Sequence, residues 1–462
     1  MDPVRDRRRG ARPLARLVVG LVVGLVVGLV GATAMVVGVA PASGSGAAAA
    51  VTEHPVGGFS ETFVDTSRPT PRNVDRPKRP ERPLETTIWY PATGAPEETG
   101  AAVPDVAGGP YPLIVFAHGF SATPATYEAL LTRIAAAGYV VAAPRFPLSS
   151  GGGPHTPDAG DVVNQPADVS FVIDELLAAS RANEGPLAGL IKAKAIGIAG
   201  HSNGAITSLG TVAHSCCRDK RIKAAAVLSG TPAPFPDGKY SFTNMPPFLA
   251  IHGTADELVA YDDIVRTFNE ARGPKVLLSV EGGDHGSSAS VSGPAAASVL
   301  ATITDFFDGY LRGDQAAIDR LPDDAQAGVT AIVAATARGS KEQIPIAPKP
   351  EYDRTVTVTP RKGLQDGDVV TVRWSGFSPG GVINILQCGP DRSSGAAGCE
   401  LTTGAILHPD PTGEGEVQLT IIEGPVGNTI CDAKHPRCVI LANDDSSLLP
   451  EAIVEVLIRF TR

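Results

Sequence analysis

The stretch Gly200-His201-Ser202-Asn203-Gly204 places one serine between two glycines, after an apolar run and before a helix-like segment. The pattern G-x-S-x-G between a strand and a helix is typical of a nucleophile elbow, where a sharp turn projects the serine hydroxyl above a sheet. Neighbouring chain passes so close to such a turn that Gly200 and Gly204 must be small. The simpler alternative is a glycine-rich turn with a capping serine. The context favours Ser202 as a nucleophile.

A nucleophilic serine needs a base that takes its proton. Three histidines follow Ser202 before residue 313: His214, His252 and His285. His214 lies about three turns along the helix that Ser202 opens, away from the site. His252 ends an apolar strand, so we expect it to pack in the core. His285 stands in a glycine-rich loop after a strand, from which it can reach over the sheet, and we predict that it is the base.

The base in turn needs a carboxylate that orients it. The candidates after Ser202 are Asp256, Glu257, Asp262, Asp263 and Asp284. Asp256 comes directly after an apolar strand, where a loop presents its side chain to the next loop, and we predict that it is the acid. Asp262 and Asp263 fit the first turn of a helix, whose dipole they complement. Asp284 adjoins His285 and cannot easily aim at its ring.

A serine that attacks a carbonyl carbon also needs two N–H donors to stabilise the oxyanion that forms. We predict the backbone N–H groups of Asn203, which follows the nucleophile, and of Phe120, which follows the strand at residues 111–117. His118 is expected to support this turn rather than to act in catalysis. Residues 147–165 are rich in glycine and proline and form a candidate substrate-access loop.

The elements that must position these residues alternate along residues 85–312. Apolar strand-like segments without polar alternation are separated by helix-like segments, which indicates a parallel sheet covered on both faces. We predict an α/β fold with a doubly wound, mostly parallel sheet across residues 50–312, and an active site beyond the carboxyl ends of its strands.

The pattern changes after residue 312. Residues 313–352 hold one possible helix at 325–339 and then prolines 345, 348 and 350, and are interpreted as a linker. From residue 353 onward, six or seven short strands alternate with turn residues such as Gln365-Asp366-Gly367. This pattern predicts an all-β sandwich at residues 353–462.

The first 42 residues combine a basic segment, an uncharged apolar stretch at Leu17–Ala40 and a small-residue exit. This is typical of a cleaved export signal, which we favour, and the alternative is an uncleaved membrane anchor. The remaining chain is therefore expected to be secreted or in the cell envelope. The net charge of −10 argues against electrostatic binding of nucleic acid.

The chain has six cysteines, which fit an oxidising compartment: Cys216, Cys217, Cys388, Cys399, Cys431 and Cys438. No CxxC pair and no Cys/His spacing suggests zinc, so we expect neither a metal nor a cofactor. For the adjacent pair Cys216-Cys217, a buried thiol pair is the simpler expectation, and a vicinal disulfide is the alternative.

The segments AHGF, GHSNG, HGTAD and GGDHG, in this order, resemble the α/β-hydrolase superfamily. The strand TTIWYPA and the stretch DVVNQPADVSFVIDELL look most like its dienelactone-hydrolase and type II platelet-activating-factor acetylhydrolase branch. The resemblance covers about residues 80–312. It implies a metal-free serine esterase with Ser202, Asp256 and His285 as the triad and Phe120 and Asn203 as oxyanion donors. Dienelactone hydrolases often use cysteine as nucleophile, and polyester-hydrolase relatives usually have Met where this chain has Asn203, which weakens the case for polymer substrates.

The C-terminal stretch VTVTPRKGLQDGDVVTVRWSGFSPGGVINILQCG, with CDAKHPRC and CVILAN, resembles the neocarzinostatin family of exported immunoglobulin-like sandwiches. The resemblance implies disulfides Cys388–Cys399 and Cys431–Cys438, although four cysteines alone allow three pairings. We rate an accessory or attachment module above ligand binding for this domain, because a sandwich fold hosts many roles.

Two functions follow from these patterns. The favoured one is an exported serine carboxylic-ester hydrolase that acts through an acyl-enzyme on a small-molecule or lipid ester, with phospholipid acetyl esters, short-chain esters, triglycerides and polyesters all open as substrates. The alternative is a binding protein whose C-terminal sandwich carries a hydrophobic small molecule.

Overall fold

The computed structural model of the chain describes twelve stretches of residues. They are 53–73, 76–94, 102–153, 155–233, 235, 238–347, 353–378, 383–389, 399–407, 410–426, 429–443 and 453–461. The export signal or anchor predicted at residues 1–42 lies outside them. Within the described stretches, no helix has the length and apolar character needed to cross a membrane.

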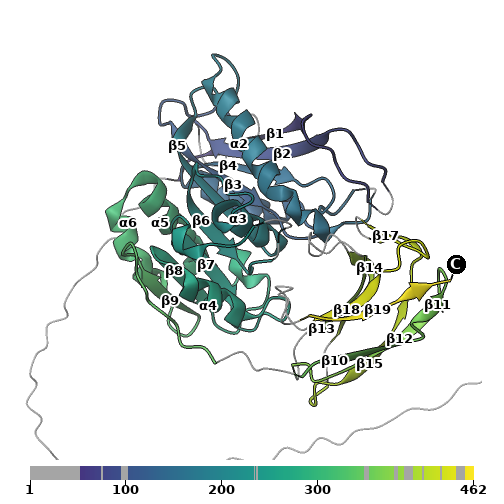
Figure 1. Cartoon of the computed structure of the whole chain (residues 1–462). Helices are drawn as coiled ribbons and strands as arrows, with labels where there is room; N and C mark the ends of the chain where they lie inside the picture. The colour runs from purple at the N-terminus through teal and green to yellow at the C-terminus, as the bar shows by residue number, and fades with distance from the viewer. Residues whose placement is uncertain are drawn as a thin grey trace, which may run out of the picture. The chain divides into compact units, whose positions relative to one another are not determined.

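A nine-stranded sheet forms the centre of the hydrolase-like region, with strand order β1-β2-β4-β3-β5-β6-β7-β8-β9 (Figure 1). The six strands from β4 to β8 in this order are parallel, and β1, β2 and β9 join antiparallel at the two edges. The strands are β1 (Val56–Asp65), β2 (Arg82–Pro91), β3 (Tyr111–Ala117), β4 (Val140–Arg145), β5 (Ile191–His201), β6 (Ile222–Leu228), β7 (Phe248–Gly253), β8 (Lys275–Val280) and β9 (Thr330–Ala335).

Six α-helices belong to the same region: α1 (Glu128–Ala136), α2 (Gln165–Arg181), α3 (Asn203–Ala213), α4 (Tyr261–Glu270), α5 (Ala296–Phe307) and α6 (Gln315–Arg320). Apolar side chains of β3 alternate between the two faces of the sheet. Ile114 and Phe116 pack with α1 and α5, whereas Leu113 and Val115 pack with α2. Both faces are therefore covered, which is why these strands lack polar alternation and why the doubly wound α/β prediction is correct.

The two edges of the sheet differ from the sequence-based expectation. β1 was not predicted, because its segment mixes glycine, threonine and charged residues and only one face of it is shielded. Residues 325–339 were expected to form a helix within a linker, but Thr330–Ala335 form β9, which pairs with β8 along its whole length. The alanines favour a helix locally, and pairing with a strand edge overrides that preference.

The segment after β9 also packs against the sheet instead of leading away as a linker. The ammonium group of the buried Lys275 donates hydrogen bonds to the carbonyl oxygens of Phe268, Ala271 and Glu342. The side-chain amide of Asn269 pairs with the backbone of Ile344 in both directions. The linker interpretation of residues 313–352 is therefore wrong for residues 313–344.

The C-terminal region is all-β. It has a three-stranded sheet β10-β12-β15, a four-stranded sheet β14-β13-β18-β19, and the pairs β11-β20 and β16-β17. Its strands are β10 (Thr355–Thr359), β11 (Lys362–Leu364), β12 (Val369–Ser375), β13 (Ile383–Cys388), β14 (Cys399–Leu407), β15 (Gly415–Thr420), β16 (Gly424–Val426), β17 (Thr429–Cys431), β18 (Val439–Asn443), β19 (Ile453–Leu457) and β20 (Arg459–Phe460). Val370, Val372, Ile383 and Ile385 of the two larger sheets share one core.

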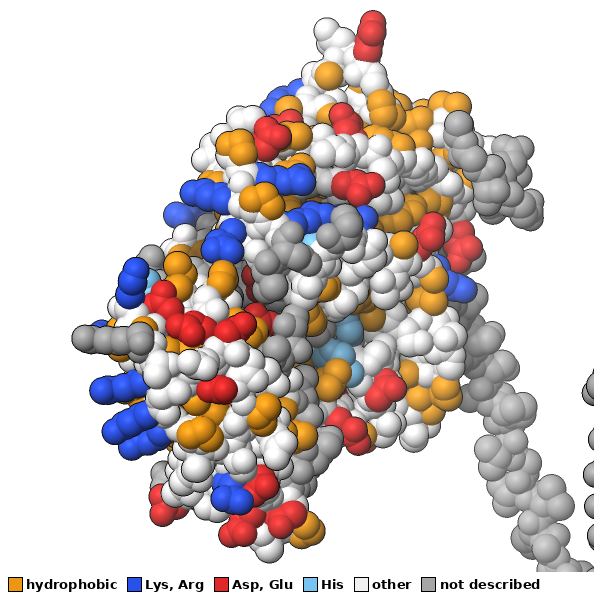
Figure 2. Space-filling view, turned by 90° about the vertical axis from the view of Figure 1, so that its right-hand side faces the viewer, with side chains coloured by type: hydrophobic (Ala, Val, Ile, Leu, Met, Phe, Trp, Pro, Cys, Tyr) orange, Lys and Arg blue, Asp and Glu red, His pale blue; other side chains and the backbone are white. Residues whose placement is uncertain are grey.

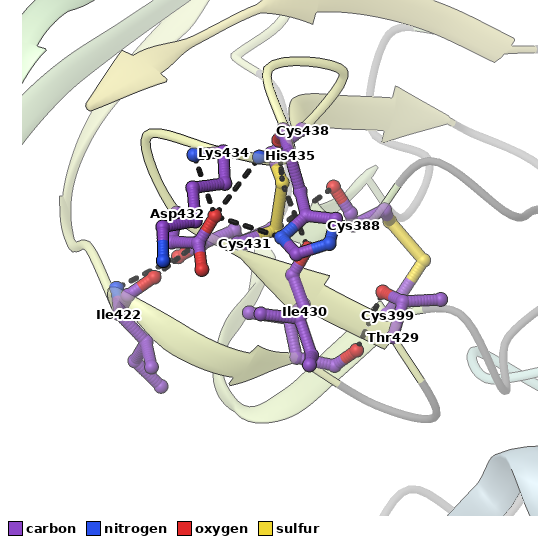
Figure 3. Close-up of a disulfide and its surroundings, with 12 residues drawn as sticks. Cys388, Cys399, Ile422, Thr429, Ile430, Cys431, Asp432, Lys434, His435 and Cys438 are labelled. Carbon is purple, nitrogen blue, oxygen red and sulfur yellow. Dashed lines mark hydrogen bonds and ion pairs between the residues drawn. A yellow bond between two sulfur atoms is a disulfide. The ribbon is translucent and has the colours of Figure 1, made fainter. Parts of the chain in front are cut away.

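Two disulfides cross-link this region, and they have the pairing that the neocarzinostatin resemblance implies (Figure 3). Cys388–Cys399 joins β13 to β14, and Cys431–Cys438 joins β17 to the residue before β18. All four cysteines are buried.

A buried ion-pair network ties the start of β2 to α2. The guanidinium of Arg82 donates to both carboxylate oxygens of Asp168, each at 2.6 Å, and to Asp161 at 2.7 Å, and all three side chains are fully buried. Arg68 donates to Asp168 from the other side at 2.8 Å. A guanidinium with this burial is tolerated only because two carboxylates neutralise it.

Replacement of Asp168 by alanine is therefore expected to lower the free energy of unfolding by about 3–5 kcal/mol, because it leaves a buried charge incompletely paired. Urea unfolding followed by circular dichroism measures this. Asp174→Ala is the control, since Asp174 lies on the same helix and pairs with Arg221 at the surface, and its loss should cost less than about 1 kcal/mol. Equal effects of the two substitutions would contradict the prediction.

Candidate active site

Ser202 lies on a tight turn between β5 and α3. Its backbone has φ 56° and ψ −119°, a left-handed conformation that costs a non-glycine residue free energy. A Cβ atom on Gly200 would come within 2.1 Å of the carbonyl oxygen of Gly204, and one on Gly204 within 2.0 Å of the carbonyl oxygen of Ala117. The turn therefore has the geometry of a nucleophile elbow, and glycine is required on both sides of it.

Three loops at the carboxyl edge of the sheet bring Ser202, His285 and Asp256 into one hydrogen-bonded series. The distance between Ser202 Oγ and His285 Nε2 is 2.8 Å, and that between His285 Nδ1 and Asp256 Oδ2 is also 2.8 Å. Ser202 follows β5, Asp256 follows β7 and His285 follows β8. The side chain of Asp256 is fully buried, while that of His285 is 18% exposed, so the ring stands between the interior and the open side of the site.

The carboxylate of Asp256 accepts hydrogen bonds at both oxygens. Its Oδ1 accepts from the backbone N–H groups of Leu258 and Val259, each at 2.9 Å. Its Oδ2 faces His285 and also the Nε2 atom of His252 at 3.2 Å. Burial alone would raise the pKa of Asp256, but the hydrogen bonds from His252, His285 and Val259 outweigh it and hold the pKa well below its usual range. The group is therefore a charged carboxylate at neutral pH.

His252 was expected to be a packed core histidine, and it is fully buried. Its Nε2 atom also lies 2.9 Å from the carbonyl oxygen of Val259. A carbonyl only accepts, so Nε2 carries the hydrogen and donates it toward Val259 and Asp256. His252 thus fixes the loop that holds Asp256, a role that the sequence pattern did not predict.

His201, the residue before Ser202, links two loops of the site. Its Nε2 lies 2.9 Å from the carbonyl oxygen of His285, and its Nδ1 lies 2.9 Å from the hydroxyl of Tyr127. That hydroxyl accepts the backbone N–H of Gly119 at 3.1 Å. Because a carbonyl only accepts, Nε2 carries the hydrogen, and Nδ1 accepts from Tyr127. The neutral ring therefore couples the loop after β3 to the loop that carries His285.

The loop after β3 leaves one amide free to meet a substrate. The N–H groups of Gly119 and Ser121 donate to the Tyr127 hydroxyl and to the carbonyl oxygen of Ser149, respectively. Between them, the N–H of Phe120 has no acceptor among the described residues. Asn203 is the first residue of α3, so its N–H has no acceptor within the helix. These are the two amides that the sequence analysis predicts as hydrogen-bond donors to the oxyanion.

His118 supports the same loop, as expected. The ring is fully buried; its Nε2 accepts the N–H of Phe146 at 3.1 Å, and its Nδ1 therefore donates to the carbonyl oxygen of Gly119 at 2.8 Å. Burial lowers the pKa of His118 to about 4, so the ring stays neutral and keeps both hydrogen bonds.

At low pH, protonation of His201 should lower the contribution of its hydrogen bonds with His285 and Tyr127 to the free energy of unfolding. Burial lowers the pKa of His201 to about 4 from an ordinary value of 6.5. The unfolded chain therefore binds more protons at this residue as the pH falls from about 6.5 to 4, and its contribution to stability, complete above pH 6.5, is lost over that window. Between pH 7.5 and 4.5 the unfolding free energy should fall by about 2 kcal/mol more in the wild type than in His201→Gln. Urea unfolding of both proteins at several pH values tests this, and parallel pH profiles would contradict it.

The adjacent cysteines Cys216 and Cys217 form a disulfide just after α3. Cys216 is exposed and Cys217 is half-buried, so the expected buried thiol pair is corrected to a vicinal disulfide near the surface. His214 directly follows α3, and its Nδ1 atom lies 3.0 Å from the sulfur of Cys216. Among the described residues these three form the one cluster with metal-ligand spacing, and both of its sulfurs are in the disulfide.

Two parts of the chain match family models. Residues 88–251 match the chlorophyllase model, and residues 356–458 match the neocarzinostatin family model. The first match includes Ser202 and ends before Asp256 and His285. The chain thus joins a chlorophyllase-like α/β-hydrolase region to a C-terminal neocarzinostatin family domain. The sequence motifs indicated the α/β-hydrolase superfamily and the neocarzinostatin family, and the likeness to chlorophyllase comes from the comparison alone.

Two individual proteins are similar to these regions. Macromomycin of Streptomyces macromomyceticus is 39% identical over 66 residues, which is 14% of this chain and 45% of that protein. The chain therefore spans less than half the length of this relative. The structure of a ferulic acid esterase from Streptomyces cinnamoneus has 26% sequence identity and a TM-score of 0.43, over 58% of this chain and 93% of that one.

Proposed function

We propose that the protein is an exported serine hydrolase of carboxylic esters, with Ser202 as nucleophile, His285 as base and Asp256 as acid. The observation that carries the proposal is the hydrogen-bonded series Ser202–His285–Asp256, with 2.8 Å at each step, on a strained turn. The hydrolase-type family match of the region supports it. The disulfides in the described part support a location in an oxidising compartment.

The mechanism follows from the geometry. His285 Nδ1–H donates to Asp256, which leaves Nε2 to take the proton of the Ser202 hydroxyl as its oxygen attacks the ester carbonyl. The N–H groups of Phe120 and Asn203 stabilise the negative charge that develops on the carbonyl oxygen. His285 then returns its proton to the leaving alkoxide, and Asp256 stabilises the transient imidazolium. Water activated by His285 hydrolyses the acyl-enzyme.

Covalent labelling and turnover together test this function. A fluorophosphonate should add one label per chain, and peptide mapping should place it on Ser202, because only an activated serine displaces fluoride. p-Nitrophenyl esters with acyl chains of two to sixteen carbons should be hydrolysed, and the preferred length would distinguish short-chain from lipid-like substrates. Ser60→Ala is the control for labelling, since Ser60 lies exposed on β1. A label elsewhere, or no hydrolysis of any ester, would overturn the proposal.

A further inference from the structure

A cavity of about 350 Å³ opens beside β2 and β4. Its walls come from described residues between 70 and 85, from Arg145 at the end of β4 and from described residues between 147 and 155, with Thr62 of β1 at one side. Four prolines and Leu148 contribute apolar surface and stiff backbone. A cavity of this size holds a small organic group.

Three arginines and one carboxylate face this cavity: Arg76, Arg79, Arg145 and Glu85. Arg145 is held in place, because its Nη2 donates to the carbonyl oxygen of Gly151 at 2.7 Å and its Nη1 lies 3.7 Å from Glu85. Glu85 is thus already opposite Arg145. Arg76 and Arg79 have no ion-pair partner among the described residues, so the described lining of the cavity carries a net positive charge.

This concentration of charge is local. On the face shown in Figure 2, basic and acidic side chains are interspersed among hydrophobic ones. The whole chain is negative, at −10. A positively charged cavity in a negative protein is a place where an anionic group gains free energy relative to the rest of the surface.

The cavity and Ser202 both lie at the end of the sheet where the parallel strands have their carboxyl ends. Arg145 is the last residue of β4 and His201 the last of β5, and β3 alone separates these two parallel strands. Two strand spacings are about 10 Å. The cavity is therefore within reach of a small ester whose carbonyl carbon is at Ser202.

The cavity wall is also bonded to the loop that carries Phe120. The N–H of Ser121 donates to the carbonyl oxygen of Ser149 at 2.8 Å, and the N–H of Gly151 donates to that of Ala122 at 3.1 Å. A ligand seated against residues 150–153 therefore touches the segment that positions the oxyanion amide. These residues belong to the segment 147–165, which the sequence analysis predicts as a substrate-access loop.

We infer that this cavity is a subsite for an anionic group, a carboxylate or a phosphate, carried by the ester substrate at the end remote from the reacting carbonyl. Arg76 and Arg79 provide the guanidinium groups that lack an ion-pair partner among the described residues, Arg145 provides a third guanidinium, and the prolines and Leu148 contact the connecting chain. The inference rests on the proposed ester hydrolase and names its substrate class.

Matched esters test the subsite. p-Nitrophenyl half-esters of dicarboxylic acids with four to ten carbons are compared with neutral p-nitrophenyl esters of the same length. The wild type should prefer a half-ester of intermediate length, since its carboxylate must span about 10 Å. The preference should fall at 0.5 M salt, because exposed charges are screened.

The double variant Arg76→Gln/Arg79→Gln should lose about five- to tenfold of kcat/KM for the preferred half-ester, mainly through KM, because two partly exposed charge pairs are lost. Its rate on the neutral esters should not change. Arg72→Gln is the control, since Arg72 is exposed on the same segment and does not line the cavity. Equal rates on charged and neutral esters in the wild type, or equal losses on both in the double variant, would overturn the inference.

Binding without turnover separates this inference from the proposed function. Suberate and inorganic phosphate are titrated calorimetrically into Ser202→Ala, with and without Arg76→Gln/Arg79→Gln. Arginine-dependent binding in a protein whose wild type hydrolyses no ester would support the subsite and overturn the esterase. Ester hydrolysis by the wild type without any arginine-dependent binding would support the esterase and overturn the subsite. Suberate binding without phosphate binding would assign the subsite to carboxylates, and the opposite result to phosphates.

Discussion

Ser202→Ala is expected to lower kcat for p-nitrophenyl ester hydrolysis by about 10⁶-fold, to the rate that binding and the oxyanion donors alone provide. The reason is that no other hydroxyl occupies the position 2.8 Å from His285 Nε2 among the described residues. Steady-state kinetics on the best ester substrate measure the loss, and active-site titration of the wild type excludes trace contamination.

The members of the proposed triad should act as one unit, so the losses of activity on their substitution should not add. His285→Ala should be about as inactive as Ser202→Ala, and the double variant no worse than either. Unfolding curves of the variants must match the wild type, which shows that the fold is intact. Retention of more than a hundredth of the activity in Ser202→Ala would mean that the serine is not the nucleophile.

Asp256→Asn is expected to lower kcat by about 10⁴-fold. The amide keeps the size of the side chain, and its oxygen can still accept from Leu258 and Val259. However, it lacks the negative charge that stabilises the imidazolium, and its N–H₂ group turned toward His285 would favour the wrong tautomer of the ring. KM should change little, because Asp256 is buried and does not contact the substrate.

Asp284→Asn is the matched control for this substitution. Asp284 adjoins His285 in sequence, but its carboxylate is exposed and pairs with Ser287 and Gly286 instead of the ring. Its variant should keep kcat within about threefold of the wild type, since surface substitutions away from the ring leave the transition state unchanged. If Asp284→Asn lowered kcat as much as Asp256→Asn, the assignment of Asp256 as the acid would be contradicted.

The order of strands and helices from β2 to α5 and the positions of Ser202, Asp256 and His285 after strand ends were accessible from sequence. Each depends on short-range signals: a glycine-flanked serine, and polar residues directly after apolar runs. Parallel strands with both faces buried leave long apolar segments, so the pattern was strong where the site is built.

His201 and His252 were not recognised as members of the site. Each lies at the end of a strand. His201 contacts the carbonyl oxygen of His285 on a loop far along the chain, whereas His252 contacts the carboxylate of Asp256 on the loop that directly follows its own strand. No local pattern records such a contact. The one available signal was the position in sequence, since one histidine directly precedes the proposed nucleophile and the other stands four residues before the proposed acid, where neighbouring loops converge.

β9 was missed for a related reason. TAIVAA is compatible with helix or strand, and the choice depends on a partner edge fifty residues earlier. Secondary-structure propensities of the local residues do not contain information about pairing with that distant strand. The same limit explains β1, whose pairing with β2 crosses an excursion of sixteen residues.

The position of β9 determines at which residue a shortened version of this protein can end. β8 is buried along all six of its residues, and β9 occupies its outer edge. A shortened protein that stops at residue 312, the end suggested by sequence, would expose an apolar strand edge with unpaired N–H and C=O groups, which is a template for aggregation. It would also remove one of the three carbonyl acceptors of the buried Lys275. A soluble fragment of the hydrolase-like region therefore has to extend through Ile344, and failed expression of a shorter fragment would not count against the proposed esterase activity.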